Sequence, residues 1–469
     1  MSCESSSITN SRIHLNESYG RNWFVYFCSL TSDLLQASFG FTSSWPSSII
    51  PKLQSNSTEI NPLPAPITSL QTSILAALPS ISGLVGLLGL AIAPNISDRV
   101  GRKSTLVCAA VAVATAYVVL VFAKSISIYF VCLSIIGFSD SVMLTNLAAY
   151  NSEISLDRNR GKILCLQGLA APVGNTIAYF AGFTNTRTIA LIGTMLPLLF
   201  LCLCYFLPES PVFLVHDEER CRRALETLRG TKEVEMEFLT IKKTIDESKK
   251  VTIIDMFKSR PSVKSFLLSQ ELFTAQVVSG IYTITAFMAP IFNESGYVSG
   301  NSIGVIAGGI QILCVFAVSF LVERLGRRPL LLFSSISIIL NLLCLGAYFY
   351  LIQSGIILTG QYGWVPLLLV VLYYVSYSIG LGPMPFTLMC ELFSNNFRKI
   401  GITSIMIVCF VQIFLALFSF PLIAEAIGVH YCLWIYCALS TIAFVVICVT
   451  MPETKGKCMS EIQDSLAQS

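Results

Sequence analysis

Runs of about 20 apolar residues recur along the whole chain and alternate with short polar segments. A run of this length forms a helix that crosses the roughly 30 Å hydrocarbon core of a bilayer. The strands of a membrane β-barrel would instead alternate apolar and polar residues. The pattern therefore predicts an all-α membrane protein with twelve transmembrane helices, near residues 23–45, 69–93, 104–123, 127–150, 162–183, 188–207, 264–292, 300–322, 329–353, 363–389, 400–424 and 430–451.

The longest polar stretch divides these spans into two groups of six. Within it, apolar residues recur at helical spacing at Leu225, Leu228, Val234, Phe238 and Ile241, which predicts short amphipathic helices. We expect a tail at 1–22, a first six-helix bundle at 23–207, a linker at 208–263, a second six-helix bundle at 264–451 and a tail at 452–469.

Composition narrows the class of protein. The chain is 54% apolar and 12% charged, whereas a soluble protein is about 25% charged. Its mean hydropathy of +0.72 excludes a water-soluble enzyme. With 30 Lys and Arg against 27 Asp and Glu, the charge is too balanced to favour a nucleic-acid partner. The sequence contains no nucleophile motif, metal-ligand spacing or phosphate-binding loop, so we expect no enzymatic activity, metal or cofactor.

The distribution of positive charge predicts the orientation. If the N-terminus is cytoplasmic, 27 of the 30 Lys and Arg lie on the cytoplasmic side, as the positive-inside rule requires. We therefore expect a multi-pass protein of the plasma membrane with both termini in the cytoplasm. Asn56 and Asn293 begin Asn-x-Ser/Thr triplets in outside loops and are candidate glycosylation sites.

Charged motifs occupy equivalent places in the two halves, which indicates a duplicated unit. They form three pairs: 98–103 (Asp-Arg-Val-Gly-Arg-Lys) with 323–328 (Glu-Arg-Leu-Gly-Arg-Arg), 153–160 with 391–398, and 208–211 (Pro-Glu-Ser-Pro) with 452–456 (Pro-Glu-Thr-Lys-Gly). This ordered set resembles the sugar-porter branch of the major facilitator superfamily. Details such as Tyr-Phe-Ala-Gly at 179–182 resemble insect facilitated trehalose and hexose transporters.

The resemblance implies a cytoplasmic gate of ion pairs that link the two halves and hold the inside shut. The residues matching that role are Asp98, Arg102, Glu153, Arg160, Glu323, Arg327, Glu391 and Arg398. The alternative is that the basic residues only enforce topology. Two positions depart from the family: Val212 replaces its Arg after Pro-Glu-Ser-Pro, and Pro94 replaces a Gly. We therefore expect a weaker gate.

A substrate site is expected between the halves. In the seventh span, Gln276, Ser279, Gly280 and Thr283 form one polar and small face. Residues 276–282 resemble the family's Gln-Gln-Leu-Ser-Gly-Ile-Asn stretch, and 380–386 resemble its Gly-Pro-Gly-Pro-Ile-Pro-Trp stretch, whose prolines predict a helix break. The expected substrate-binding residues are Gln276, Ser279, Tyr282, Gln311 and Phe386, with Gln167 and more weakly Asn175 from the first half. The alternative for Gln276 and Gln311 is that they are interhelical hydrogen-bonding residues.

Three acids lie within the spans: Asp33, Asp140 and Glu271. Proton-coupled members of the family carry an acid in Phe-Gly-Tyr-Asp, whereas the matching stretch here ends in Thr42, which favours facilitated diffusion. Asp33 or Asp140 is a candidate for proton coupling, with a structural hydrogen-bonding role as the alternative.

The leading interpretation is transport of a sugar, a hexose or trehalose, by alternating access and facilitated diffusion, with the sugar and the lipid bilayer as partners. One alternative is proton-coupled transport of a sugar or another small organic solute. The other is a non-transporting sugar sensor.

Overall fold

The structure, a computed structural model, describes residues 22–92, 100–246, 253–293, 298–356, 362–393 and 397–451. A few side chains within these ranges, that of Glu323 among them, are not described. Every regular element in the described ranges is a helix. The first half contains α2 (Asn22–Leu53), α3 (Ser69–Ile92), α5 (Arg102–Val121), α6 (Ile126–Ile154), α7 (Asp157–Ala181) and α8 (Thr186–Leu203).

The linker and the second half follow. The linker contains the short helices η1 (Cys204–Phe206) and η2 (Phe213–His216), then α9 (Glu218–Arg229), α10 (Glu235–Asp246) and α11 (Ile253–Lys258). The second half contains α12 (Arg260–Val278), α13 (Ile281–Ala286), α14 (Met288–Phe292), α15 (Gly300–Leu325), α16 (Arg327–Gln353), α17 (Trp364–Ile379), α18 (Met384–Leu392), α19 (Arg398–Ile427) and α20 (Val429–Thr450).

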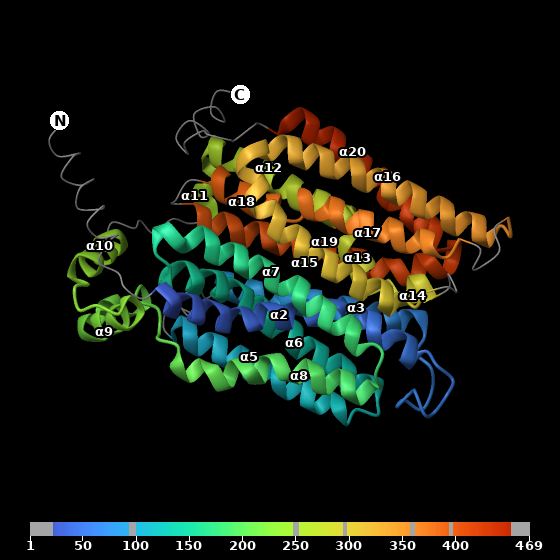
Figure 1. Cartoon of the computed structure of the whole chain (residues 1–469), viewed down its shortest axis with the longest axis horizontal. Coiled ribbons are helices and arrows are strands. Elements are labelled where there is room, and N and C mark those ends of the chain that lie inside the picture. The colour runs from blue at the N-terminus through green and yellow to red at the C-terminus, as the bar shows by residue number, and fades with distance from the viewer. Residues whose placement is uncertain are drawn as a thin grey trace.

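Ten of the twelve expected spans are helices long and apolar enough to cross a bilayer. The other two are α2, which is rich in serine, and the run α12–α14, which is divided into short pieces. Both run through the bundle beside the other ten (Figure 1). The prediction of an all-α membrane protein with twelve spans is therefore confirmed.

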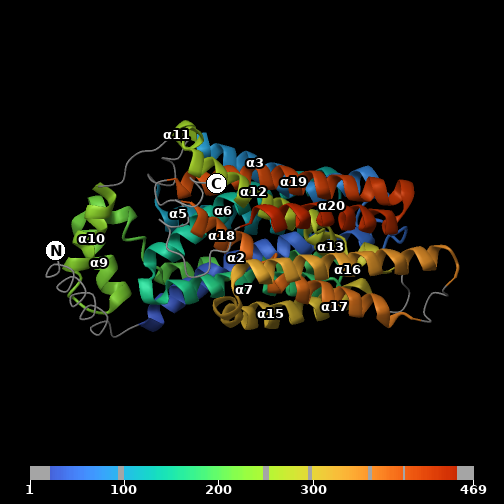
Figure 2. The ribbon, with the colours of Figure 1, turned by 90° about the horizontal axis from the view of Figure 1, so that it is seen from above.

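The two halves lie side by side with their helices along one common direction (Figures 1 and 2). Helices α9, α10 and α11 lie at one end of the bundle, which we call the linker end; the other is the opposite end. The halves meet along α3 and α19 and along α7 and α15. Glycines allow this close approach, because Gly83 faces the ring of Phe410 and Gly308 faces Thr176.

The first span is longer than the sequence analysis expects. Helix α2 continues to Leu53 through Pro46 and Pro51, eight residues past the expected end at 45. A proline removes one backbone donor, but it does not end a helix whose outer turns pack against neighbouring elements. Ile49, Ile50 and Leu53 are fully buried in the core there, so packing overrides the local proline signal.

The amphipathic helices expected in the linker are present. Val215, Cys221, Leu225, Val234 and Phe238 form a small core of their own under α9 and α10. Leu228 packs instead into the core of the first half. The linker helices are therefore attached to the first half by an apolar contact as well as by the chain.

Candidate functional site

The seventh span is broken at the expected polar face. Gly280 adopts a left-handed conformation with φ of +83°, so α12 ends at Val278 and α13 begins at Ile281. A left-handed residue cannot continue a right-handed helix. The hydroxyl of Ser279 donates to the carbonyl of Gln276 over 2.7 Å. The expectation of one continuous helix over 264–292 is therefore wrong.

Gln276 joins this break to the break in the tenth span. Its amide nitrogen donates to the hydroxyl of Tyr377 over 2.7 Å and to the carbonyls of Leu381 and Gly382 over 3.2 and 3.4 Å. The Tyr282 hydroxyl donates to its amide oxygen over 3.4 Å. Residues 380–383 interrupt the tenth span between α17 and α18, as the prolines predict. Every polar group of Gln276 is thus engaged by the protein.

Tyrosine hydroxyls continue this network through the second half, and sequence reasoning missed them. Tyr373 donates to the carbonyl of Ser279 over 3.0 Å, and Thr283 shares a hydrogen bond of 2.8 Å with Tyr436. The available signal was the phenol groups at 373, 374 and 377, which lie within about one helical turn. Phenol groups therefore surround the break in the seventh span, and one of them, Tyr282, stands where the resembled family has an Asn.

Gln311 differs from Gln276 in having an open acceptor. It is 7% exposed, and its Oε1 atom has no hydrogen-bond partner. Gln311 follows Gly304 by seven residues and Gly308 by three, so all three lie on one face of α15. The two glycines pack on Tyr179 and Thr176 of α7. The Oδ1 atom of Asn175, on α7, is also buried without a partner. Amide oxygens of both halves, those of Asn175, Gln311 and Asn301, therefore lie along the α7–α15 interface without a partner among the described residues; Asn301 packs on Gly182.

The remaining expected contacts lie elsewhere. Phe386 is 49% exposed, and its ring packs edge-to-face on Phe273 with centroids 5.0 Å apart. Gln167 accepts a hydrogen bond of 3.1 Å from Asn151 and so belongs to a network inside the first half. A cavity of about 260 Å³ lies behind the break in the seventh span, lined mostly by apolar side chains, but neither Gln276 nor Gln311 lines it.

The acids inside the spans have neutral partners. Asp33 accepts hydrogen bonds from Asn151 over 2.9 Å and from Ser29 over 3.3 Å, and its contacts include no described Lys or Arg. Asp140 is 3% exposed and lies beside Thr42, and its Oδ1 atom has no partner. The Thr450 hydroxyl lies 2.8 and 3.0 Å from the two carboxylate oxygens of Glu271.

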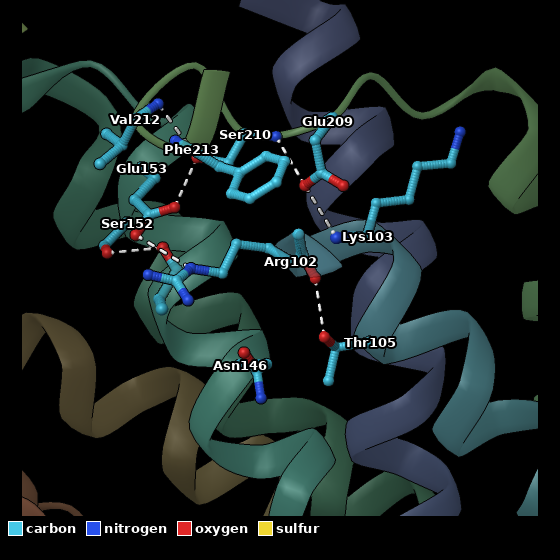
Figure 3. A network of polar contacts seen from close by, with 12 residues as sticks. Arg102, Lys103, Thr105, Asn146, Ser152, Glu153, Glu209, Ser210, Val212 and Phe213 are labelled. Atoms are coloured by element: carbon cyan, nitrogen blue, oxygen red, sulfur yellow. Dashed lines mark hydrogen bonds and ion pairs between the residues drawn. The ribbon is translucent and has the colours of Figure 1, made fainter. Parts of the chain in front are cut away.

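Figure 3 shows the polar network at the linker end of the first half. Arg102 Nε lies 3.4 Å from Glu153 Oε1, and the Ser210 hydroxyl donates to the other oxygen of Glu153. Glu209 accepts from the backbone N–H groups of Lys103 and Ser210, each over 2.9 Å. The Pro-Glu-Ser-Pro motif therefore binds both the start of α5 and the end of α6.

The second half repeats part of this arrangement. Arg327 Nη2 lies 3.0 Å from Glu391 Oε1. Gly101 and Gly326, in the paired motifs, have φ of 97° and 89° before α5 and α16. The same turn thus precedes the same helix in each half, which supports the duplication.

The structure describes ion pairs for four of the eight expected gate residues. Each described ion pair, Arg102–Glu153 and Arg327–Glu391, joins residues of the same half, whereas the sequence analysis expects pairs that link the halves. Arg160 and Arg398 lie at the starts of α7 and α19. Asp98 lies outside the described residues, as does the side chain of Glu323.

At the opposite end, hydrogen bonds link the two halves directly. The Tyr179 hydroxyl donates to the carbonyl of Thr285 over 2.8 Å, and the backbone N–H of Ala289 donates to Ser47 over 2.8 Å. Asn56 and Asn293 are exposed near this end, and Asn293 accepts a bond of 2.9 Å from the backbone of Gly300. The halves are therefore in direct contact across the opposite end.

The sequence pattern of the sugar (and other) transporter family matches residues 23–466. The facilitated trehalose transporter Tret1 of Polypedilum vanderplanki is 30% identical over 406 residues, 85% of this chain and 80% of that protein. Tret1 of Aedes aegypti is 27% identical over 450 residues, 94% of this chain and 55% of that protein. The inward-open conformation of the xylose transporter XylE from E. coli shares the fold, with a TM-score of 0.78 at 20% identity over 94% of this chain and 99% of that one. The chain belongs to the sugar (and other) transporter family.

Proposed function

We propose that this protein carries a sugar, a hexose or trehalose, across the plasma membrane by alternating access and facilitated diffusion. The observation that carries the proposal is the pair of unpartnered amide oxygens at Gln311 and Asn175. A buried acceptor without a donor costs about 1–3 kcal/mol. Sugar hydroxyls are donors that offset this cost, and the two oxygens come from different halves, so one ligand would bridge both. The relatives named as facilitated trehalose transporters support the same substrate class.

The proposal includes an orientation. The linker end faces the cytoplasm with both termini, and the opposite end faces outward with glycosylated Asn56 and Asn293. The contacts Tyr179–Thr285 and Ala289–Ser47 support an outer side that is closed in this conformation. Gate pairs that link the halves at the linker end then belong to the reverse conformation, in which the bundles have rocked together there.

Uptake into vesicles reconstituted with purified protein tests the function. We expect saturable uptake of trehalose or glucose that stops at equal concentrations, with no uptake of a panel of non-sugar solutes. Gln311→Leu removes the open acceptor, and we expect it to raise KM at least about tenfold, equivalent to about 1.4 kcal/mol.

The matched control is Asn341→Leu, an amide of the same half whose nitrogen donates to the carbonyl of Ser337 within its own helix. We expect its KM to stay within twofold. Uptake of a non-sugar solute with no sugar uptake would overturn the proposal, and sugar binding without uptake would favour the sensor.

Proton-coupled transport is the second candidate, because Asp140 has a buried carboxylate oxygen without a partner. A proton carried on that oxygen could enter and leave with the cycle. Vesicles with an imposed pH gradient distinguish the two. Accumulation of sugar above its equilibrium level that Asp140→Asn abolishes would support coupling, and uptake that ignores the gradient would exclude it.

A further inference from the structure

Arg229, the last residue of α9, is the most deeply buried basic side chain of the linker helices, only 2% exposed. Its Nε and Nη2 atoms lie 2.6 to 3.2 Å from the carboxylate oxygens of Glu237 on α10. Its Nη1 atom donates to the backbone carbonyl of Ile154 over 2.9 Å. A planar guanidinium can bind both oxygens of the carboxylate through its fork and still donate to the carbonyl, whereas an ammonium has no such fork.

Ile154 is the last residue of α6, so its carbonyl is one of those that lack a partner inside the helix. A helix C-terminus also carries partial negative charge, which favours a nearby cation. The preceding residue, Glu153, binds Arg102 and the hydroxyl of Ser210. Arg229 therefore contacts the same helix end that bears the carboxylate of the expected gate.

A positive charge that the resembled family carries near this contact is missing at Val212. The resembled family places an arginine there, whereas here the Val212 backbone N–H donates to Ser210 over 3.2 Å and the side chain carries no charge. The loss of this positive charge predicts a weaker gate. Arg229 supplies a guanidinium to the end of α6 from a different element.

Other ion pairs of the linker are of a different kind. Arg223, on the same helix, pairs with Glu219 one turn away, and both side chains are exposed. A hydrogen bond from Lys242 lowers the pKa of Glu218, and a hydrogen bond from Arg222 lowers the pKa of Glu235. Exposed pairs of this kind contribute little to stability because water and salt screen them. The pair of Arg223 lies within α9 and involves neither α6 nor α10, so Arg223 is a matched control for Arg229.

We propose that Arg229 is a positioning residue of the transport cycle. It fixes the pair α9–α10 to the end of α6, so that the linker moves as part of the first half and Glu153 stays aligned with Arg102 and Ser210. This inference rests on the proposed transport by alternating access. It predicts that loss of the guanidinium slows the conformational step and leaves the substrate site intact.

The test combines uptake kinetics with hydrogen exchange on the full-length protein in vesicles. For Arg229→Gln we expect Vmax for the transported sugar to fall about tenfold, with KM within twofold of the wild type. Backbone amides of α9, α10 and the last turn of α6 should exchange faster. Arg229→Lys should fall between the two proteins, and Arg223→Gln should match the wild type in both measurements.

Two results would overturn the inference: an unchanged Vmax in Arg229→Gln, or a reduced Vmax together with a several-fold higher KM, which would place the effect at the substrate site. If Arg229→Gln does not fold, Glu237→Gln is the second variant. It keeps the bond from Arg229 to Ile154 but weakens the clamp, by which we mean the joint contact of Arg229 with Glu237 and Ile154. We expect the Vmax of Glu237→Gln to fall several-fold. If the protein transports no sugar, hydrogen exchange still tests the clamp, because unchanged exchange in α9 and α10 would refute it independently of transport.

Discussion

At the scale of single residues, the two glutamines of the second half have opposite states. Gln276 is saturated by protein partners, since three acceptors share its N–H groups and Tyr282 donates to its oxygen. Gln311 keeps an oxygen that nothing satisfies. The proposed substrate would therefore meet an open acceptor at Gln311, whereas at Gln276 it would first have to replace Tyr377 or Tyr282. The glutamine kept in the sequence motif thus acts in this conformation as a brace between two broken helices.

Substitution of Gln276 tests this brace. Gln276→Ala leaves the Tyr377 hydroxyl without its partner, and an unpaired buried hydroxyl costs about 1–3 kcal/mol. We expect a lower midpoint of thermal unfolding together with reduced uptake. Val277→Ala, its neighbour on the apolar side of the helix, should reduce the midpoint with little effect on KM. A Gln276→Ala protein that unfolds at the wild-type temperature would contradict the bracing role.

Several residues of the site could be predicted from the sequence, but the groups that they contact could not. Gln276, Gln311, Glu153 and Arg102 were named from motifs, and the structure gives partners or surroundings for each. Tyr377 and Arg229 were missed, because their roles depend on contacts 101 and 75 residues away along the chain. No local pattern encodes a contact of that separation.

At the scale of elements, the sequence indicates the break in the tenth span more clearly than the break in the seventh span. Pro383 and Pro385 predict the break before α18, because each removes a backbone hydrogen-bond donor. The break after α12 depends on one glycine, and glycine alone is common inside membrane helices. Only its left-handed conformation shows that Gly280 ends the helix.

Gly280→Ala tests this break. A side chain in the left-handed region costs about 1–2 kcal/mol, and the new Cβ would lie 3.2 Å from the ring of Tyr436. We expect a lower midpoint of thermal unfolding and slower uptake. Gly309→Ala is the control, because that position lies within α15 with nothing within 4 Å of an added Cβ. If the two variants behave alike, the conformation of Gly280 does not matter.

At the scale of the whole molecule, glycine contacts on α7 and α15 seal the opposite end. A Cβ at Gly304 would lie 2.5 Å from the ring of Tyr179, whose hydroxyl bonds across to Thr285. Close packing of this kind is bistable, because a small intrusion forces the surfaces apart.

Gly304→Ala should therefore shift the population toward the conformation that is open at the opposite end. A cysteine placed at Ser47, on that buried interface, reports the shift through its rate of labelling by a membrane-impermeant maleimide from outside. We expect labelling several-fold faster in the Gly304→Ala background than in the Gly309→Ala background. Equal rates would show that these contacts do not hold the end closed.

The overall architecture is the feature that the sequence predicts best. Twelve apolar runs and a polar linker suffice to predict the all-α fold, because each span must satisfy its own backbone hydrogen bonds in lipid. The family match confirms the prediction of a transporter and not an enzyme. The contacts between the halves could not be read, since they depend on small residues that look alike wherever they occur.

The length of α2 has a consequence for the bilayer around the protein. Its 32 residues extend about 48 Å, well beyond the roughly 30 Å of hydrocarbon, and a tilt of about 20° shortens this only to about 45 Å. The ends of the bundle therefore stand in the headgroup layer. Arg102 and Arg327 begin α5 and α16 at the linker end. In the proposed orientation they would lie near lipid phosphates, which are alternative partners to Glu153 and Glu391. Anionic phospholipids would then compete for the arginines of the gate, and the transport rate would depend on the charge of the inner leaflet.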